Sequence, residues 1–153
     1  QKAIDFGLET TGGPLVIDGN PVLLAELLKN LIDNALKYTP EGGRVTVRTL
    51  ATEKAIVEVE DTGIGVPEAD RERVFERFYR VLGSSESGSG LGLPIVREIA
   101  ELHRAHVSLN PNPAGRGTIA QVVFPRSRPT PEETAAQTTQ ALTAPGATQF
   151  PPA

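Results

Sequence analysis

The amino-acid sequence predicts an α/β fold of the two-layer kind (an α+β sandwich), in which one sheet carries its helices on a single face. Three observations predict it. Strand-like segments with a two-residue period alternate with helix-like segments along residues 2–125. One long segment has a single apolar stripe at helical spacing. The candidate strands are joined by short Gly-, Asn- and Pro-containing turns.

Six segments have the alternation of strands. Ile4, Phe6 and Leu8 alternate with polar residues, and residues 15–18 are a second short candidate. Residues 44–50 and 55–61 lie so close together that an antiparallel hairpin turning at 52–54 is expected. Residues 107–109 and 118–124 complete the sheet around an Asn/Pro/Gly turn.

Three segments have helical spacing. Asn20 is a good N-cap and Pro21 suits the first helical position, so the long helix is expected to begin there and to end near Thr39, before Pro40. Its buried stripe consists of Leu24, Leu27, Leu28, Leu31, Ile32, Ala35 and Leu36. A short helix at 68–79 and an amphipathic helix at 91–102 are also expected.

Composition excludes several classes of protein. With 15 Lys and Arg against 19 Asp and Glu, the net charge of -4 does not favour nucleic acid as a partner. No apolar run approaches the roughly 20 residues of a membrane span. The chain has no Cys and two His, so any metal site is expected to use oxygen or amide ligands.

The chain divides into two parts. Residues 1–125 carry all the strand and helix patterns, whereas residues 126–153 are rich in Pro, Ala and Thr and are expected to be a disordered tail. The first residue is Gln1 rather than Met, which predicts that the sequence is a piece of a longer protein.

The long helix carries an unusual polar face opposite its leucine stripe, made of Glu26, Asn30, Asp33, Asn34 and Lys37. Asn is a poor helix former, yet two of these positions, one turn apart, are Asn. An amide oxygen can ligate magnesium without repelling phosphates, and a lysine can meet phosphate charge directly. A merely solvated face is the alternative.

Two glycine-bearing loops add candidate binding residues. In residues 61–67, Asp61 at a strand end can accept a hydrogen bond from an amino group such as that of adenine, while Gly63 and Gly65 let the backbone approach a flat ligand. An ordinary Asx turn is the alternative. Residues 88–93, Gly-Ser-Gly-Leu-Gly-Leu, open a helix and present amides to phosphate, with a flexible linker as the alternative.

Together these segments resemble the ATP-binding catalytic domain of bacterial two-component sensor histidine kinases. Residues 26–38 resemble the N box, 61–65 the first glycine box, 74–80 the F box and 88–93 the second glycine box. The resemblance covers nearly all of residues 2–125. It implies the Bergerat fold, with a mixed, mainly antiparallel sheet of about five strands packed on three helices, and it implies ATP and magnesium as ligands.

The resemblance also assigns expected roles. Asn34 and Asn30 are expected at the magnesium ion and nucleotide, Lys37 and Arg80 near the phosphates, and Glu26 as an assistant in proton removal. The other expected nucleotide contacts are Tyr38, Asp61, Gly63, Ile64, Gly65, Gly88, Ser89, Gly90, Leu91, Gly92, Leu93 and Thr118.

The sequence departs from the family in two ways. The phosphoacceptor His segment of such kinases is absent, and His103 and His106 are expected to be structural or surface residues. Arg104 stands where relatives often have Gly. The resemblance therefore implies a domain that donates phosphate to a histidine on the dimerisation helices of a parent kinase, with a response regulator as the next partner.

The parent is expected to be a homodimer in a bacterial inner membrane, with this domain in the cytoplasm and monomeric when isolated. Three alternatives remain open. A gyrase- or Hsp90-like ATPase and a serine-kinase anti-sigma factor both tend to keep a Glu where this sequence has Asn30. A degenerate nucleotide fold that serves only as a docking module is the third.

Overall fold

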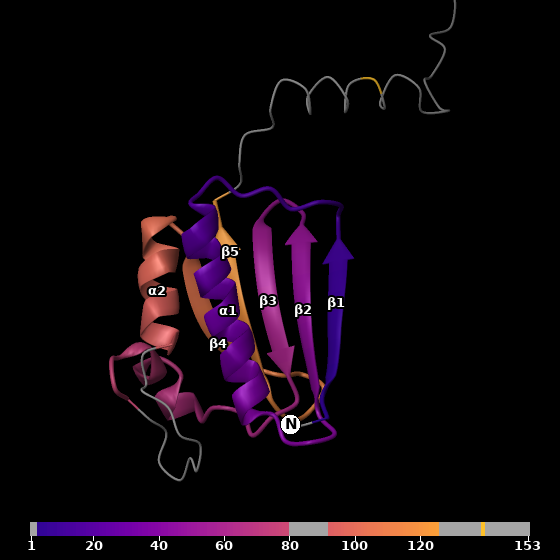
Figure 1. Cartoon of the computed structure of the whole chain (residues 1–153), viewed down its shortest axis with the longest axis vertical. Helices are drawn as coiled ribbons and strands as arrows, with labels where there is room; N and C mark the ends of the chain where they lie inside the picture. Colours follow the sequence, from indigo (N-terminus) through magenta and orange to yellow (C-terminus); the bar gives the residue numbers. More distant parts are fainter. Residues whose placement is uncertain (1–2, 80–91, 126–138, 140–153) are drawn as a thin grey trace, which may run out of the picture.

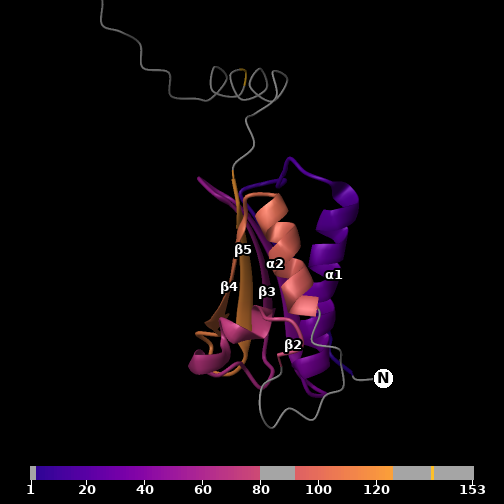
Figure 2. The same ribbon diagram turned by 90° about the vertical axis from the view of Figure 1, so that its left-hand side faces the viewer.

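The computed structural model describes residues 3–79, 92–125 and 139. Its centre is one five-stranded sheet with the strand order β1-β2-β3-β5-β4. Two α-helices, α1 (Pro21–Tyr38) and α2 (Gly92–Leu102), pack against each other on the same face of this sheet (Figures 1 and 2). This arrangement confirms the predicted two-layer α/β fold.

Helix α1 begins and ends where its sequence predicts. The Asn20 side chain caps the helix, because its Oδ1 accepts hydrogen bonds from the backbone N–H groups of Val22 and Leu23 at 3.0 and 3.2 Å. The leucine stripe faces the sheet, and Leu27 and Leu31 are each only 2% exposed. The helix stops at Tyr38, with Thr39 as its C-cap, before Pro40.

The predicted hairpin forms the middle of the sheet. Strands β2 (Arg44–Ala51) and β3 (Ala55–Asp61) are antiparallel, and β3 also pairs with β5 (Thr118–Phe124). Strand β4 (His106–Pro111) borders β5, whereas β1 (Asp5–Thr11) runs parallel to β2. The sheet is therefore mixed and mainly antiparallel, as expected, and the end of β3 is central to it.

The prediction of a helix at 68–79 is wrong. The chain forms two single 3-10 turns, η1 (Glu68–Asp70) and η2 (Arg73–Phe75), and Phe78 then has a positive φ of 64°. The segment folds back on itself because the Tyr79 hydroxyl bonds the Asp70 carboxylate and Arg73 stacks on the Tyr79 ring, 4.6 Å from its centroid. These contacts replace the hydrogen-bond ladder of an α-helix.

Residues 15–18 also form no strand. Leu15 and Ile17 pack partly buried against the core, and Val16 and Asp18 are exposed, so the predicted alternation of burial is present. The segment lies between β1 and α1 and pairs with no strand in the sheet. A two-residue period thus predicted the alternation of burial but not pairing with a neighbouring strand.

Helix α2 ends in a Schellman motif. The N–H of Ala105 donates to the carbonyl of Ala100 at 2.8 Å, and the N–H of Arg104 to that of Glu101 at 3.0 Å. Arg104 is consequently held at φ 54°, a conformation that favours Gly. His103 precedes it, and its Nε2 accepts a hydrogen bond from the backbone N–H of Asn20 at 3.1 Å. His103 is thus structural, as predicted, and joins the end of α2 to the start of α1.

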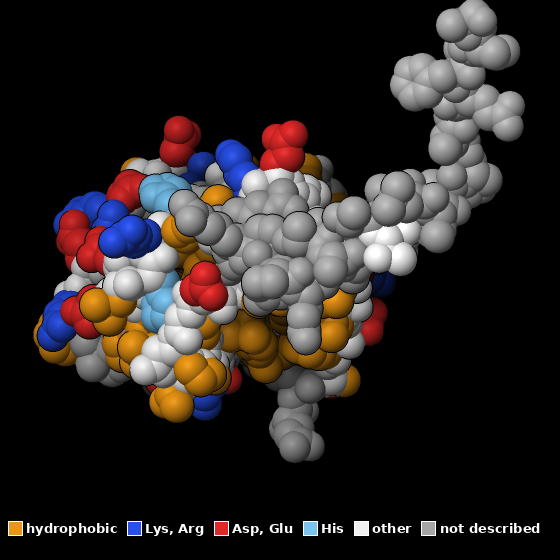
Figure 3. Space-filling model, turned by 90° about the horizontal axis from the view of Figure 1, so that it is seen from above, with side chains coloured by type: hydrophobic (Ala, Val, Ile, Leu, Met, Phe, Trp, Pro, Cys, Tyr) orange, Lys and Arg blue, Asp and Glu red, His pale blue; other side chains and the backbone are white. Residues whose placement is uncertain are grey.

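Several large apolar side chains remain on the surface. Phe6 and Leu8 of the edge strand β1 share the pairing registers of the buried Val45 and Val47, yet they are 51% and 69% exposed. Figure 3, which looks onto the molecule from above, shows hydrophobic side chains at the surface beside interspersed acidic and basic ones. None of the helices formed by the described residues is long and apolar enough to cross a membrane.

Candidate nucleotide-binding site

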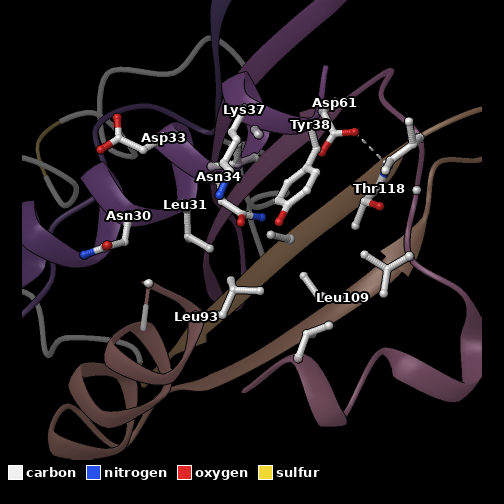
Figure 4. A pocket seen from close by; sticks show the side chains of 18 of the residues that line it. Asn30, Leu31, Asp33, Asn34, Lys37, Tyr38, Asp61, Leu93, Leu109 and Thr118 are labelled. Carbon is white, nitrogen blue, oxygen red and sulfur yellow. Dashed lines mark hydrogen bonds between the residues drawn. The ribbon is translucent and has the colours of Figure 1, made fainter. Parts of the chain in front are cut away.

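A cavity of about 290 Å³ lies between α1, the start of α2 and the sheet. Helix α1 contributes one polar and one apolar row to its wall: Asn30, Leu31, Asp33, Asn34, Ala35, Lys37 and Tyr38. The sheet, the loops and α2 contribute Val59, Asp61, Ile64, Gly65, Val66, Val74, Tyr79, Gly92, Leu93, Leu109, Thr118 and Ala120. Figure 4 shows side chains from these separate segments converging on one space.

Asn34 and Tyr38 lie one turn apart on α1 and both point into the cavity (Figure 4). Within the part of the chain that the structure describes, the side-chain amide of Asn34 makes no hydrogen bond, although the residue is partly buried. A polar group in that position is expected to find a partner in a ligand or in water. Lys37 reaches the same wall, and its ammonium lies 5.4 Å from the Tyr38 ring centroid.

Asn30 has a different environment from Asn34. Its Nδ2 donates to the backbone carbonyl of Glu26 at 2.8 Å and to Glu26 Oε1 at 3.2 Å. Its Oδ1 lies toward α2, since a Cβ added to Gly92 would lie 3.3 Å from it. Glu26 itself does not line the cavity. The structure thus brings Asn30, but not Glu26, to the candidate site.

Asp61 lies at the end of β3 and is 8% exposed. Its Oδ1 accepts hydrogen bonds from the backbone N–H groups of Gly63 at 2.9 Å and Thr118 at 3.2 Å, the second of which is dashed in Figure 4. Burial raises the pKa of this carboxyl above 3.8, and the two N–H donors oppose that rise. No hydrogen bond among the described residues uses its Oδ2, which leaves that oxygen for a ligand.

The glycines of residues 61–65 shape the wall beside Asp61. A Cβ on Gly63 would lie 2.4 Å from the backbone oxygen of Tyr38, so only Gly fits between α1 and this loop. Gly65 has a φ of 75°, which L side chains rarely adopt. Gly65 and Ile64 line the cavity, whereas Gly63 acts from behind it by donating to Asp61. The paired glycines thus have distinct tasks.

The apolar floor was not predicted as part of a site. It comprises Val59, Leu109 and Ala120 from three adjacent strands, and Val74 and Tyr79 lie at its edge. In sequence these residues look like ordinary core positions of strands, because they alternate with outward-facing ones. Only the register β3-β5-β4, which brings Val59 beside Ala120 and Ala120 beside Leu109, shows that they form one flat surface.

The remaining expected nucleotide contacts divide into two groups. Thr118, Gly92 and Leu93 line the cavity. Arg80, Gly88, Ser89, Gly90 and Leu91 lie outside the described residues. The described part also contains no cluster of three or more His, Cys, Asp or Glu that would hold a metal ion. A cation here would need amide oxygens and ligands supplied by a bound molecule.

Comparison with known proteins identifies the family of this fold and site. Residues 19–128 match the family described as histidine kinase-, DNA gyrase B- and HSP90-like ATPases. Sensor protein kinase PmrB of Pseudomonas aeruginosa is 38% identical over 133 residues, or 84% of this chain and 28% of PmrB. Sensor protein QseC of Salmonella typhi is 44% identical over 108 residues, or 71% of this chain and 23% of QseC. The chain thus spans about a quarter of these relatives.

Solved structures agree with the sequence matches. The mycobacterial sensor histidine kinase MprB superposes with a TM-score of 0.72 at 36% identity, covering 80% of this chain and 82% of that one. The catalytic domain of histidine kinase ThkA superposes with a TM-score of 0.71 at 27% identity, covering 82% of each chain. The chain therefore belongs to the family of histidine kinase-, DNA gyrase B- and HSP90-like ATPases and corresponds to the ATP-binding catalytic domain of bacterial sensor histidine kinases.

Proposed function

We propose that this domain binds Mg-ATP and donates the γ-phosphoryl group to a histidine on the dimerisation helices of a parent sensor kinase, for relay to a response regulator. The observation that carries the proposal is that Asn34 and Asp61 line the same cavity. Among the described residues, the Asn34 amide has no hydrogen-bond partner and the buried Asp61 carboxylate has one unused oxygen. That pair matches a ligand with an amino-bearing base at one end and phosphates at the other.

The base end belongs to Asp61. Its Oδ1 is occupied by two backbone N–H groups, so Oδ2 accepts the exocyclic amino group of adenine. The ring then lies on the apolar floor formed by Val59, Ala120 and Leu109, with Thr118 beside it. An apolar floor and a few fixed polar groups are the usual composition of a cofactor site.

The phosphate end belongs to α1. The amide oxygens of Asn34 and Asn30 suit a magnesium ion whose remaining ligands are phosphate oxygens and water, since they add no negative charge. When bound, the ion neutralises charge on the phosphates during transfer. Lys37 supplies a cation on the same wall, and the site residues Arg80, Gly88, Ser89, Gly90 and Leu91 are proposed to contact the phosphates as well.

Transfer to a histidine, rather than hydrolysis, is favoured by residue 30. Phosphoryl transfer breaks the bond between the γ-phosphorus and its bridging oxygen and forms a P–N bond to the imidazole, so positioning and charge stabilisation dominate. A hydrolase needs a base for its water. Asn30, whose amide is engaged by Glu26, cannot accept that proton, so hydrolysis by the domain alone is expected to be slow.

Relatives are consistent with these ligands and partners. A similar solved structure is that of full-length ShkA in complex with AMPPNP, and another is ThkA in complex with the response regulator TrrA. The proposal extends both interactions to this domain. It also includes a monomeric isolated domain, and a homodimeric parent in a bacterial inner membrane that holds the domain on the cytoplasmic side.

Binding tests the site directly. Isothermal titration with a non-hydrolysable ATP analogue, with and without magnesium, is expected to give micromolar-range affinity for the wild type. Asn34→Ala should remove the magnesium dependence, and Asp61→Ala should abolish binding. Lys29→Ala is the control, because Lys29 lies on α1 outside the cavity and is exposed. A folded wild-type domain without detectable binding would move the function to the docking-module alternative.

Phosphotransfer tests the activity. The domain is mixed with a separately produced helical segment that carries the acceptor histidine, together with labelled ATP. Acid-labile, base-stable label on that segment is the expected result, and it should be lost with Asn34→Ala. Label released as free phosphate at a comparable rate without the segment would instead support an ATPase.

A further inference from the structure

Asn112, in the turn between β4 and β5, is 3% exposed and uses all of its polar groups. Its Nδ2 donates to the backbone carbonyl of Asp61 at 3.1 Å, and its Oδ1 accepts from the N–H of Ala114 at 2.9 Å. Its own N–H donates to the carbonyl of Gly117, and its carbonyl accepts from Gly115, both at 3.1 Å. One buried side chain thus closes the turn and ties it to the end of β3.

Gly117 brings the same turn against Asp61. A Cβ at this position would lie 1.9 Å from the backbone oxygen of Asp61, and Gly117 has a φ of 109°. The next residue, Thr118, donates its N–H to Asp61 Oδ1. The turn therefore contacts both the main chain and the carboxylate of Asp61, so a shift of the turn moves the carboxylate.

Burial singles out this cluster. The buried polar side chains of the described residues are Thr39, Thr46, Asp61, Asn112 and Thr118. Three of them, Asp61, Asn112 and Thr118, are linked through the contacts just described. Asn112 does not line the cavity, and its amide reaches the ligand side only through Asp61.

We infer that Asn112 is a positioning residue that sets the Asp61 carboxylate for base recognition; this inference rests on the proposed nucleotide site. Recognition of a base by a single carboxylate requires placement within about 0.5 Å. Removal of the Asn112 amide leaves the Asp61 carbonyl buried without a donor, which favours a local rearrangement. Pro113 disfavours the helical region for the backbone of Asn112, and the bonds to Asp61 and Ala114 hold its side-chain amide.

The test compares two bases on the whole 153-residue chain. Non-hydrolysable analogues of ATP and of inosine triphosphate are titrated into wild type, Asn112→Ala and Asn112→Asp. Inosine carries a carbonyl and an N1–H where adenine has an amino group and an N1 acceptor, so the affinity ratio reports recognition of the base edge that Asp61 is proposed to bind. Asn112→Asp keeps the bond from Ala114 but cannot donate to Asp61. Asn110→Ala is the matched control, because Asn110 is exposed near the end of β4, two residues before Asn112.

The wild type is expected to prefer the adenosine analogue by about tenfold or more, the factor that about 1.4 kcal/mol supplies. Both Asn112 variants should bring that ratio close to one, mainly through weaker adenosine binding, and Asn110→Ala should keep it. A folded Asn112 variant with the wild-type ratio overturns the inference. A wild type that binds neither analogue overturns the proposed function instead.

A second measurement needs no nucleotide, so it tests the role of Asn112 even if the proposed function fails. Amide hydrogen exchange at Gly63 and Thr118 reports their bonds to Asp61 Oδ1. In Asn112→Asp their exchange should accelerate by about tenfold or more relative to the amide of Val122 in the core, as loss of local protection predicts. Unchanged exchange at both amides would show that Asn112 does not hold the Asp61 carboxylate, and equal acceleration at Val122 would show that Asn112 only supports the fold in general. Either result would overturn the inference.

Discussion

At the scale of single residues, Asp61 combines burial with a charge. Its carboxyl is hydrogen-bonded on one oxygen, and burial raises its pKa because the charged form is desolvated. A buried carboxylate with one oxygen left for a ligand costs folding free energy when no ligand is present. The domain is therefore expected to have a lower free energy of unfolding than a variant in which residue 61 is neutral.

Asp61→Asn tests this expectation. Asn keeps an oxygen that accepts from Gly63 and Thr118, so the free energy of unfolding at pH 7 should stay within about 1 kcal/mol of the wild type or rise. Binding of an ATP analogue should be lost. Urea unfolding and calorimetric titration of the same samples measure both. A clearly destabilised variant would show that the carboxylate charge itself supports the fold.

The difference in stability between the wild type and Asp61→Asn is expected to depend on pH. A folded-state pKa above the unfolded value means that the native protein binds the proton more tightly, so lowering pH toward 3.8 relieves the cost of the buried charge. The stability of the wild type relative to Asp61→Asn should therefore rise as pH falls through the raised pKa. Above that window the difference should be constant.

Arg104 is a second residue with a measurable cost. It holds the C′ position of the Schellman motif at φ 54°, where a side chain costs about 1 kcal/mol compared with Gly. Arg104→Gly should raise the free energy of unfolding by about that amount. Arg104→Ala is the control, because it removes the side chain but keeps the Cβ, and it should change little. Thermal and urea unfolding measure both variants.

At the scale of elements, α1 and α2 are joined at one end by His103. Its Nδ1 lies 2.8 Å from the carbonyl of Ile99 and must carry the proton there, so Nε2 is free to accept from Asn20. The ring also fills the space beside Gly19, where a Cβ would lie 2.4 Å from it. His103→Ala should lower the free energy of unfolding by about 1–2 kcal/mol.

The control for that substitution is His106→Ala, because His106 is exposed on β4. It should leave stability unchanged within about 0.5 kcal/mol. Hydrogen exchange locates the effect: in His103→Ala the first turn of α1 should lose protection, while the centre of the sheet should not. Equal losses in both variants would mean that the ring has no specific role.

Some elements were predictable because their signals are local. Asn20 and Pro21 mark the start of α1, and the alternation in β2 and β3 identifies the hairpin, since each depends on neighbours in sequence. The helix at 68–79 was mispredicted because Tyr79 and Asp70 bond each other across the segment, which spacing alone does not reveal. Within the candidate site, Asn34 and Asp61 were identifiable by residue type. Asn112 was not, because its role depends on a contact with a residue 51 positions away.

At the scale of the whole molecule, the core formed by the described residues ends with β5. All buried hydrophobic residues of the described part lie between Leu27 and Phe124, and the expected domain boundary is residue 125. A chain that ends at Pro125 should therefore keep its midpoint of thermal unfolding within about 2 °C and keep its affinity for an ATP analogue. A chain that ends at Gly117 lacks β5 and should not fold. A large loss of stability on cutting at 125 would place part of the fold in residues 126–153.

The pairing of β3 with β5 also has a consequence for biosynthesis. Ala55 pairs with Phe124, a partner about seventy residues later, and β5 separates β3 from β4. While the chain is still emerging from the ribosome, β3 has only β2 beside it, and the floor of the cavity has no second half. The nucleotide can therefore bind only after the last strand has been released, because loop closure over that distance must precede the pairing. Nascent domains of this kind should be unable to use ATP as a folding ligand until synthesis of the domain is finished.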